Sequence, residues 1–203
     1  MSSPLWHNVG FSMNRAVTAS RHAPSRQDSP DKAWSTHPFA VPRALRGWLT
    51  DRGSLTRRLK ARHADFHVRP VARGFARPFP DEVRILSLSP QTQAYVRDVL
   101  LFGGGHARVF AHSVLPRPTL RGAWWGITHL GTKSLGEVLF TNPRIQRLGL
   151  SVRRLDTRHP LYRAACRHIR IDTRHLWARR SVFCLDGRPL LVTEVFLPAL
   201  LNP

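Results

Sequence analysis

The clearest hydrophobic pattern lies near the end of the chain, where two apolar runs flank the pair Asp186–Gly187. Because Asp-Gly accepts the positive φ of a type I′ turn, residues 181–198 are predicted to form a β-hairpin. The period of two then places Glu194 on a strand face that is otherwise apolar. A carboxylate there is costly unless a cation pairs with it or it takes up a proton. Glu194 is therefore a candidate functional residue, although an edge-strand position or a structural salt bridge would explain it equally well.

A second hairpin, at residues 92–116, carries the opposite charge in the same kind of place. Three glycines, 103–105, join two runs of strand-forming residues. Arg97 alternates onto the same face as Tyr95 and Val99. A guanidinium stays charged and presents a planar fork that matches a carboxylate. Arg97 and Glu194 could therefore neutralise each other, or a small anionic ligand could lie between them.

The remaining periodicity predicts helices and further strands. Residues 44–62 have helical spacing that is broken at Gly53, and Ser54 is a good cap for the second piece. Ser134 and Glu137 have the spacing of a capping box, which predicts another helix start. The free amides near Leu55 and Leu135 are therefore candidate anion contacts, with simple capping as the alternative. Strands are expected at 66–75 and 145–155, and a short helix at 161–168.

These elements predict an α+β fold with a single domain. We expect one antiparallel sheet of about six strands, helices packed on one face of it, and an enclosed ligand pocket between sheet and helices. The domain is expected to span residues 41–203. Residues 1–40 are rich in serine, proline and basic residues and are predicted to be a disordered N-terminal extension.

Composition limits the classes of function. The formal charge is +20 over 203 residues, and only three of the 32 basic residues are lysines. The arginines are dispersed, and no recognition helix or aromatic RNA-binding strand is evident, so no specific nucleic-acid partner is expected. The chain has neither a secretory signal nor an apolar run of the ~20 residues that a membrane span needs. Its two cysteines suit a cytoplasmic protein, and Cys166 and His168 lack the paired spacing of a zinc site.

Seven short segments occur in the order found in chorismate lyases. They are Trp48–Leu49, Ser54–Thr56, Tyr95–Leu101, Leu130–Gly136, Leu139–Phe140, Leu176–Arg180 and Pro189–Pro198. Together they cover the chain from about Ala44 to Pro198. Each segment alone is a weak signal, but the ordered set is specific, so the chain resembles the chorismate lyase family.

The resemblance implies an activity and a set of site residues. The chain is expected to convert chorismate to 4-hydroxybenzoate and pyruvate by elimination, the first committed step of ubiquinone biosynthesis. Arg97 matches the arginine that holds the ring carboxylate, and Glu194 the acid at the ring hydroxyl. Leu55 and Leu135 match positions that contact the ligand, mainly through backbone amides. The resemblance implies a cytoplasmic monomer that needs neither a metal nor another cofactor.

Two other classes remain open on the sequence. Effector-binding domains of some bacterial transcription regulators resemble this fold and bind small molecules without catalysis. Those domains normally follow a winged-helix DNA-binding domain, for which residues 1–40 are too short and too rich in proline and serine. A basic RNA-associated protein would instead show steep salt dependence of binding and no small-molecule pocket.

Overall fold

The computed structural model describes residues 34–37, 40–122 and 124–202. Its centre is one six-stranded antiparallel sheet with the strand order β1-β2-β3-β6-β5-β4. The strands are β1 (His67–Ala76), β2 (Ala94–Gly103), β3 (His106–Pro116), β4 (Gln146–Asp156), β5 (His175–Leu185) and β6 (Arg188–Phe196). The predicted α+β class and the six-stranded antiparallel sheet are thus confirmed.

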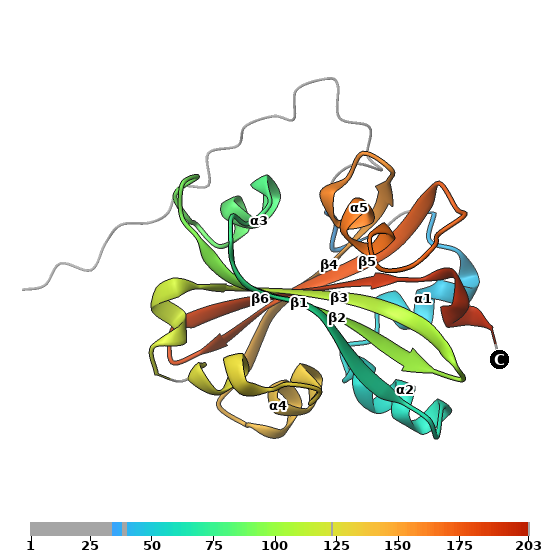
Figure 1. Cartoon of the computed structure of the whole chain (residues 1–203), viewed down its shortest axis with the longest axis horizontal. Coiled ribbons are helices and arrows are strands. Elements are labelled where there is room, and N and C mark those ends of the chain that lie inside the picture. Colours follow the sequence, from blue (N-terminus) through green and yellow to red (C-terminus); the bar gives the residue numbers. More distant parts are fainter. Residues whose placement is uncertain (1–33, 38–39, 123, 203) are drawn as a thin grey trace, which may run out of the picture.

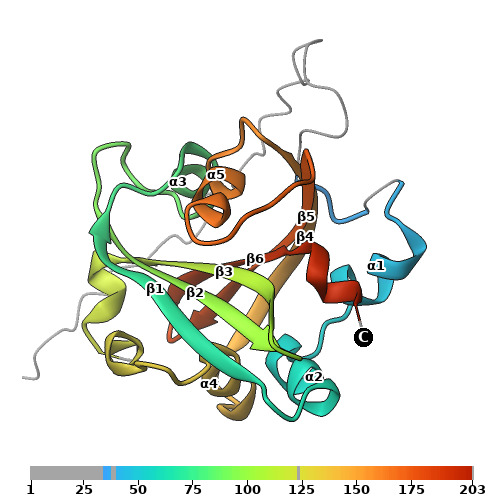
Figure 2. The same cartoon turned by 45° about the vertical axis from the view of Figure 1, so that its right-hand side comes forward.

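The helices cover both faces of the sheet rather than the single face expected (Figures 1 and 2). The lower layer of Figure 1 contains α2 (Leu55–Arg62) and α4 (Leu135–Thr141), and α1 (Arg43–Leu49) packs into the same core as α2. The upper layer contains α3 (Pro80–Ile85) and α5 (Pro160–Cys166). Helix α3 was not predicted, because six residues give too short a periodic pattern to recognise. Short 3₁₀ helices occupy Arg117–Leu120, Trp125–His129 and Pro198–Leu201.

Both predicted hairpins form, and Asp186–Gly187 makes the expected turn. Asp186 and Gly187 have φ values of 52° and 73°, and Gly104 and Gly105 have 57° and 70°. Positive φ at both central residues is the property of a type I′ turn, which favours Gly and Asp. The turn at 186–187 fixes the register in which β5 pairs with β6. The turn at 104–105 sets the register in which β2 and β3 begin to pair.

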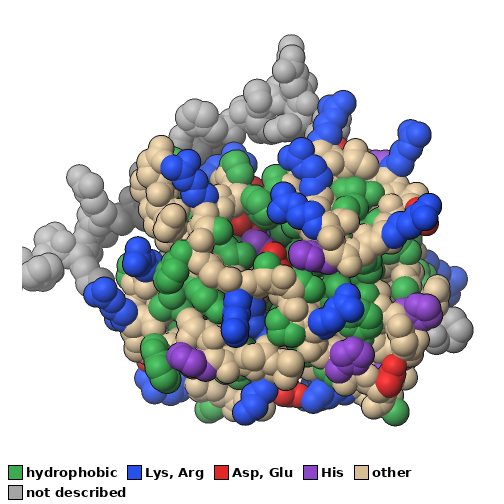
Figure 3. All heavy atoms as spheres, viewed as in Figure 1, with side chains coloured by type: hydrophobic (Ala, Val, Ile, Leu, Met, Phe, Trp, Pro, Cys, Tyr) green, Lys and Arg blue, Asp and Glu red, His purple; other side chains and the backbone are tan. Residues whose placement is uncertain are grey.

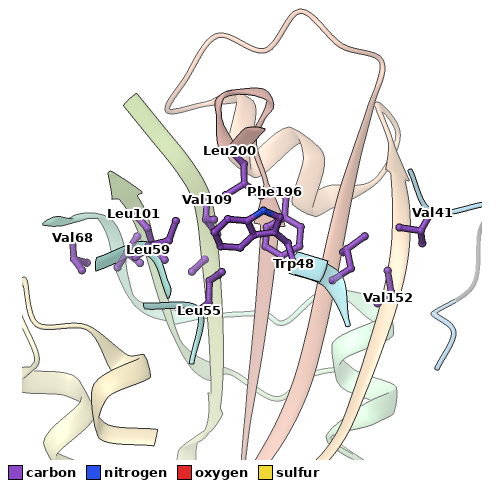
Figure 4. Packing of buried hydrophobic residues seen from close by; sticks show 13 residues of the cluster. Val41, Trp48, Leu55, Leu59, Val68, Leu101, Val109, Val152, Phe196 and Leu200 are labelled. Carbon is purple, nitrogen blue, oxygen red and sulfur yellow. The ribbon is translucent and has the colours of Figure 1, made fainter. Parts of the chain in front are cut away.

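The helices of the lower layer pack on an apolar part of the sheet. Trp48 from α1 and Leu59 from α2 lie over Leu101, Val109 and Phe196 of the sheet (Figure 4). Leu59 and Val109 have no exposed surface at all. Because this packing covers one end of the sheet face, the start of α2 is fixed above the middle of the same face.

The opposite face holds a buried cluster of charges. His112 of β3 lies between Asp98 of β2 and Glu82 of α3, with Nδ1 2.5 Å from the Asp98 carboxylate and Nε2 3.1 Å from that of Glu82. Phe79 stacks on the imidazole at 5.2 Å. Burial alone would lower the pKa of His112, but the two carboxylates raise it to about 10. The cluster attaches α3 to the sheet through a protonated histidine.

Part of the expected N-terminal extension lies outside the described residues, namely 1–33 and 38–39. Trp34 and Ser35 are described, and both contact the domain. The Trp34 indole donates a hydrogen bond of 2.7 Å to Asp81, and Ser35 forms an isolated bridge with Val152 of β4. The domain boundary at residue 41 stays a prediction.

The arginines divide between surface and interior. On the face shown in Figure 3 the basic side chains are scattered and do not gather in one patch. Arg97, Arg108 and Arg179 are buried, so a solvated surface does not account for every arginine. Arg108, for example, donates through Nε to the Gly103 carbonyl at 2.6 Å. In the described part of the chain, no helix is both long and apolar enough to cross a membrane.

Candidate active site

A pocket lies between the lower face of the sheet and the first turns of α2 and α4. All four residues singled out from the sequence line it: Leu55, Arg97, Leu135 and Glu194. About 550 Å³ inside it is free of atoms, part of this open to solvent. That the pocket closes fully around a ligand stays a prediction.

The floor of the pocket is made of small side chains on the central strands. A row running across the sheet contains Arg97, Ser113, Val192 and Ser181. The next row contains Val99, Ala111, Glu194 and Arg179. Because serine and alanine leave space above the central strands, a planar ring can lie on this floor with charged groups at its edges.

Arg97 is a buried cation that forms no ion pair with a carboxylate of the described residues. Only 4% of its surface is exposed, and its Nη2 donates to the carbonyls of Gly131 and Lys133, each at 3.0 Å. Burial lowers its pKa below the usual value for an arginine. Among the described residues no carboxylate forms an ion pair with it, so its remaining donors can receive an anionic ligand.

Glu194 has a partner, and that partner is not Arg97. Its Oε2 lies 2.5 Å from Nε of Arg179, which faces it on β5. Arg97 is on β2, separated from β6 by the whole of β3, which puts the two backbones roughly 10 Å apart. The possibility that Arg97 and Glu194 neutralise each other is therefore wrong, and the space between them is open for a ligand.

The two helix starts above the pocket differ. Ser54 caps α2 as predicted, because its Oγ accepts a hydrogen bond from the Arg57 amide at 3.3 Å. Ser134 precedes α4 as predicted, but the capping-box bonds are absent. Its Oγ instead lies 2.6 Å from Oγ1 of Thr56 and joins the two helices. Glu137, the other expected member of the box, forms an ion pair with Lys60 of α2.

Glycine is required where these helices touch. A Cβ added at Gly136 would lie 2.5 Å from Oγ1 of Thr56. Gly136 therefore lets the first turn of α4 approach α2, and this approach sets the roof of the pocket.

Sequence reasoning missed two arginines of the site, Arg179 and Arg147. The sequence contained enough information to identify Arg179, because a two-residue turn at 186–187 places residue 179 opposite residue 194. Its Nη1 also donates to the carbonyls of Trp48 and Asp51 at 2.8 and 2.7 Å. Arg147 lines the pocket from β4. Its position depends on a bulge and on the pairing of two strands joined by a long connection, which no local pattern reveals.

The sequence matches the family model described as "Chorismate lyase" over residues 33–202. The chain belongs to the chorismate lyase family. Similar curated chorismate lyases are two proteins named "Probable chorismate pyruvate-lyase". The one from Thiobacillus denitrificans is 62% identical over 92% of this chain and 100% of the relative. The one from Nitrosomonas europaea is 46% identical over 85% of this chain and 97% of the relative. The chain is thus a lyase.

Solved structures resemble this chorismate lyase in fold. The crystal structure of PhnF from Mycobacterium smegmatis matches with a TM-score of 0.52 at 14% identity, covering 73% of this chain and 65% of that one. A PhnF C-terminal domain matches with the same TM-score at 12% identity, over 64% of this chain and 82% of that one. At such identities the likeness describes the fold and says nothing of activity.

The pocket of this chorismate lyase is equipped for an anion. It offers guanidinium groups and hydroxyls, and its one acid is already paired. Within the described ranges, no group of three or more His, Cys, Asp or Glu side chains is placed to hold a metal ion. The site chemistry available from the chain itself is electrostatic binding, hydrogen bonding and positioning.

Proposed function

We propose that the enzyme converts chorismate to 4-hydroxybenzoate and pyruvate in this pocket. The observation that carries the proposal is that Arg97 and Glu194, an acid two strands away, line the same pocket. Arg97 is a buried cation that pairs with no carboxylate in the described part of the chain. Arg97 holds the ring carboxylate of the substrate, and Glu194 accepts a hydrogen bond from the ring hydroxyl. Leu55 and Leu135 contact the ring region at the starts of α2 and α4.

The chemistry is an elimination that leaves an aromatic ring. The C–O bond between the ring and the enolpyruvyl group breaks, and its electron pair leaves with the oxygen. The electron pair of the neighbouring ring C–H bond completes the aromatic system, and the proton ends on the leaving group, which becomes pyruvate. Since aromatisation supplies the driving force, the enzyme contributes mainly by fixing one substrate conformation and stabilising charge on the leaving oxygen.

Ultraviolet absorbance tests the proposal directly. Chorismate added to the purified enzyme should give the spectrum of 4-hydroxybenzoate together with one equivalent of pyruvate in a coupled assay. An effector-binding domain of the same fold would bind the compound and leave its spectrum unchanged over hours, and that result would refute the proposal. Arg97→Ala serves as the negative control for contaminating lyase.

The proposed function includes the cellular location, the oligomeric state and the pathway of the enzyme. The enzyme acts as a cytoplasmic monomer and, by making 4-hydroxybenzoate, carries out the first committed step of ubiquinone biosynthesis. Complementation of a bacterial strain that lacks its own chorismate lyase should restore ubiquinone, and light scattering should give a mass near 23.1 kDa. If light scattering showed a stable dimer, the proposed monomeric state would be wrong, while the proposed reaction would be unaffected.

A further inference from the structure

Arg147 is the second cation that lines the pocket, and the proposed function leaves it without a role. Its side chain is half-buried and reaches the pocket from β4, the edge strand on the opposite side of the sheet from β2. The backbones of β2 and β4 are four strand spacings apart, roughly 19 Å. Arg97 and Arg147 therefore enter the pocket from two different sides.

Arg147 is held in place but its hydrogen-bonding capacity is not used up. Its guanidinium carbon lies 5.4 Å from the ring centre of Phe140 and 5.1 Å from that of Phe183. Its Nη1 donates to the Arg52 carbonyl at 2.7 Å. Its Nε is buried and has no hydrogen-bond partner. A buried donor without a partner destabilises the protein, and a ligand oxygen that accepts from it would remove this cost.

Within the described chain no carboxylate forms an ion pair with Arg147. Burial and the neighbouring Arg179 lower the pKa of Arg147 below the usual value for an arginine, and Glu194 opposes them. Ser181 of β5 offers a second unpartnered group in the same pocket, because its buried Oγ has no hydrogen-bond partner. The pocket thus has spare donors on the side away from Arg97.

We propose that Arg147 binds the carboxylate of the enolpyruvyl group, so that the two negative charges of the substrate lie between two arginines. This inference rests on the proposed function and adds the contact that recognises the leaving group. The carboxylate stays charged throughout the elimination, while new negative charge develops on the ether oxygen beside it. Arg147 therefore binds the substrate and also stabilises the departing group, with Ser181 as a further donor. The product 4-hydroxybenzoate lacks this carboxylate and does not use Arg147.

Comparing substrate with product tests this assignment. Arg147→Gln should lower kcat/KM for chorismate on the order of 100-fold, the effect of losing one charged hydrogen bond. The dissociation constant of 4-hydroxybenzoate, measured by calorimetry, should change less than about twofold, and Arg147→Lys should recover part of the lost activity. Arg144→Gln is the matched control, because Arg144 is 70% exposed, pairs with Asp186 and lies outside the pocket lining.

Three results would overturn the assignment. Equal losses for chorismate and 4-hydroxybenzoate would make Arg147 a support of the pocket, and unchanged kcat/KM would remove it from the site. If Arg144→Gln lowered kcat/KM to the same extent, the effect would come from the change in net charge and not from the position of Arg147. If the wild-type enzyme leaves chorismate unreacted, the proposed function is wrong, but this result does not by itself decide whether Arg147 binds the enolpyruvyl carboxylate. The affinities of wild-type and Arg147→Gln protein for intact chorismate then decide the present inference alone.

Discussion

Glu194 and Arg179 face each other across β6 and β5, with 2.5 Å between Oε2 of the acid and Nε of the arginine. Only 1% of the Arg179 side chain and 17% of the Glu194 side chain are exposed. Arg179 also bonds to the carbonyls of Trp48 and Asp51, which lie at the end of α1 and in the loop that follows. The pair therefore fixes the orientation of the acid and joins the helical layer to the sheet.

Removing Arg179 should destabilise the fold. Arg179→Met leaves Glu194 without its cation and two carbonyls without their donor, and breaking a buried ion pair costs about 3–5 kcal/mol. Urea unfolding of wild type and variant measures the loss. Arg144→Met, which breaks the exposed pair with Asp186, should cost under about 1 kcal/mol. Equal losses in the two variants would contradict the structural role of Arg179.

Arg97→Ala should weaken both substrate and product. In the proposed binding mode it removes a buried charge that faces the ring carboxylate, which both ligands carry, so we expect a loss of about 3 kcal/mol, or more than 100-fold. Calorimetric titration with 4-hydroxybenzoate provides the measurement. Arg73 lies opposite Arg97 on β1 and is exposed, so Arg73→Ala tests for a general charge effect and should change the affinity less than threefold.

Glu194→Gln should keep the fold and lose turnover. Glutamine has nearly the same shape and its amide oxygen can still accept the hydrogen bond from Arg179, so circular dichroism should match wild type even though the lost ion pair lowers the free energy of unfolding. The carboxylate that the proposed function places at the ring hydroxyl is lost. We expect kcat to fall on the order of 100-fold, within the range for a general acid–base group. Wild-type turnover in this variant would remove Glu194 from the mechanism.

Stability should fall at alkaline pH because of His112. Its pKa of about 10 in the folded protein lies above the 6.5 of an ordinary histidine, so its contribution to stability is complete below about pH 6.5 and is lost as pH rises through 10. The free energy of unfolding should fall by at most about 1.4 kcal/mol per pH unit in this window from this one group. Urea titrations of His112→Gln should show a flatter profile. His129→Gln, at an exposed position, should follow wild type.

Gly136→Ala should disturb the roof of the pocket. The new Cβ would meet Oγ1 of Thr56 at 2.5 Å, so α4 must move away from α2. We expect weaker binding of 4-hydroxybenzoate and a loss of about 1–3 kcal/mol of stability, as for other overpacked contacts. In a Thr56→Ala background, which removes that oxygen, the same change should be much less damaging. Equal effects in both backgrounds would show that the contact is not the cause.

Local pattern was sufficient for much of this fold. Asp186–Gly187 and the glycines at 103–105 require positive φ, and the alternation around them puts Arg97 and Glu194 on inward-facing positions. The site itself depends on more distant relations. Arg147 enters it through the pairing of β4 with β5, and the contact of Gly136 with Thr56 exists only once two helices meet. The expectation of helices on one face only was wrong because both α3 and α5 pack on the other face. Helix α3 is attached there through Glu82 and His112, a tertiary contact that leaves no periodic pattern in the sequence.

The alternation of β2 carries a consequence for how this strand can pair. Arg97 lines the pocket, and its neighbour Asp98 binds His112 on the other side of the sheet. A slip of one residue would present an aspartate to an anionic substrate and place a guanidinium against a protonated imidazole. Both exchanges set like charges together, so misregistered pairing of this strand is penalised twice. The same two residues that serve binding and packing thereby also protect the sheet against its nearest wrong alignment.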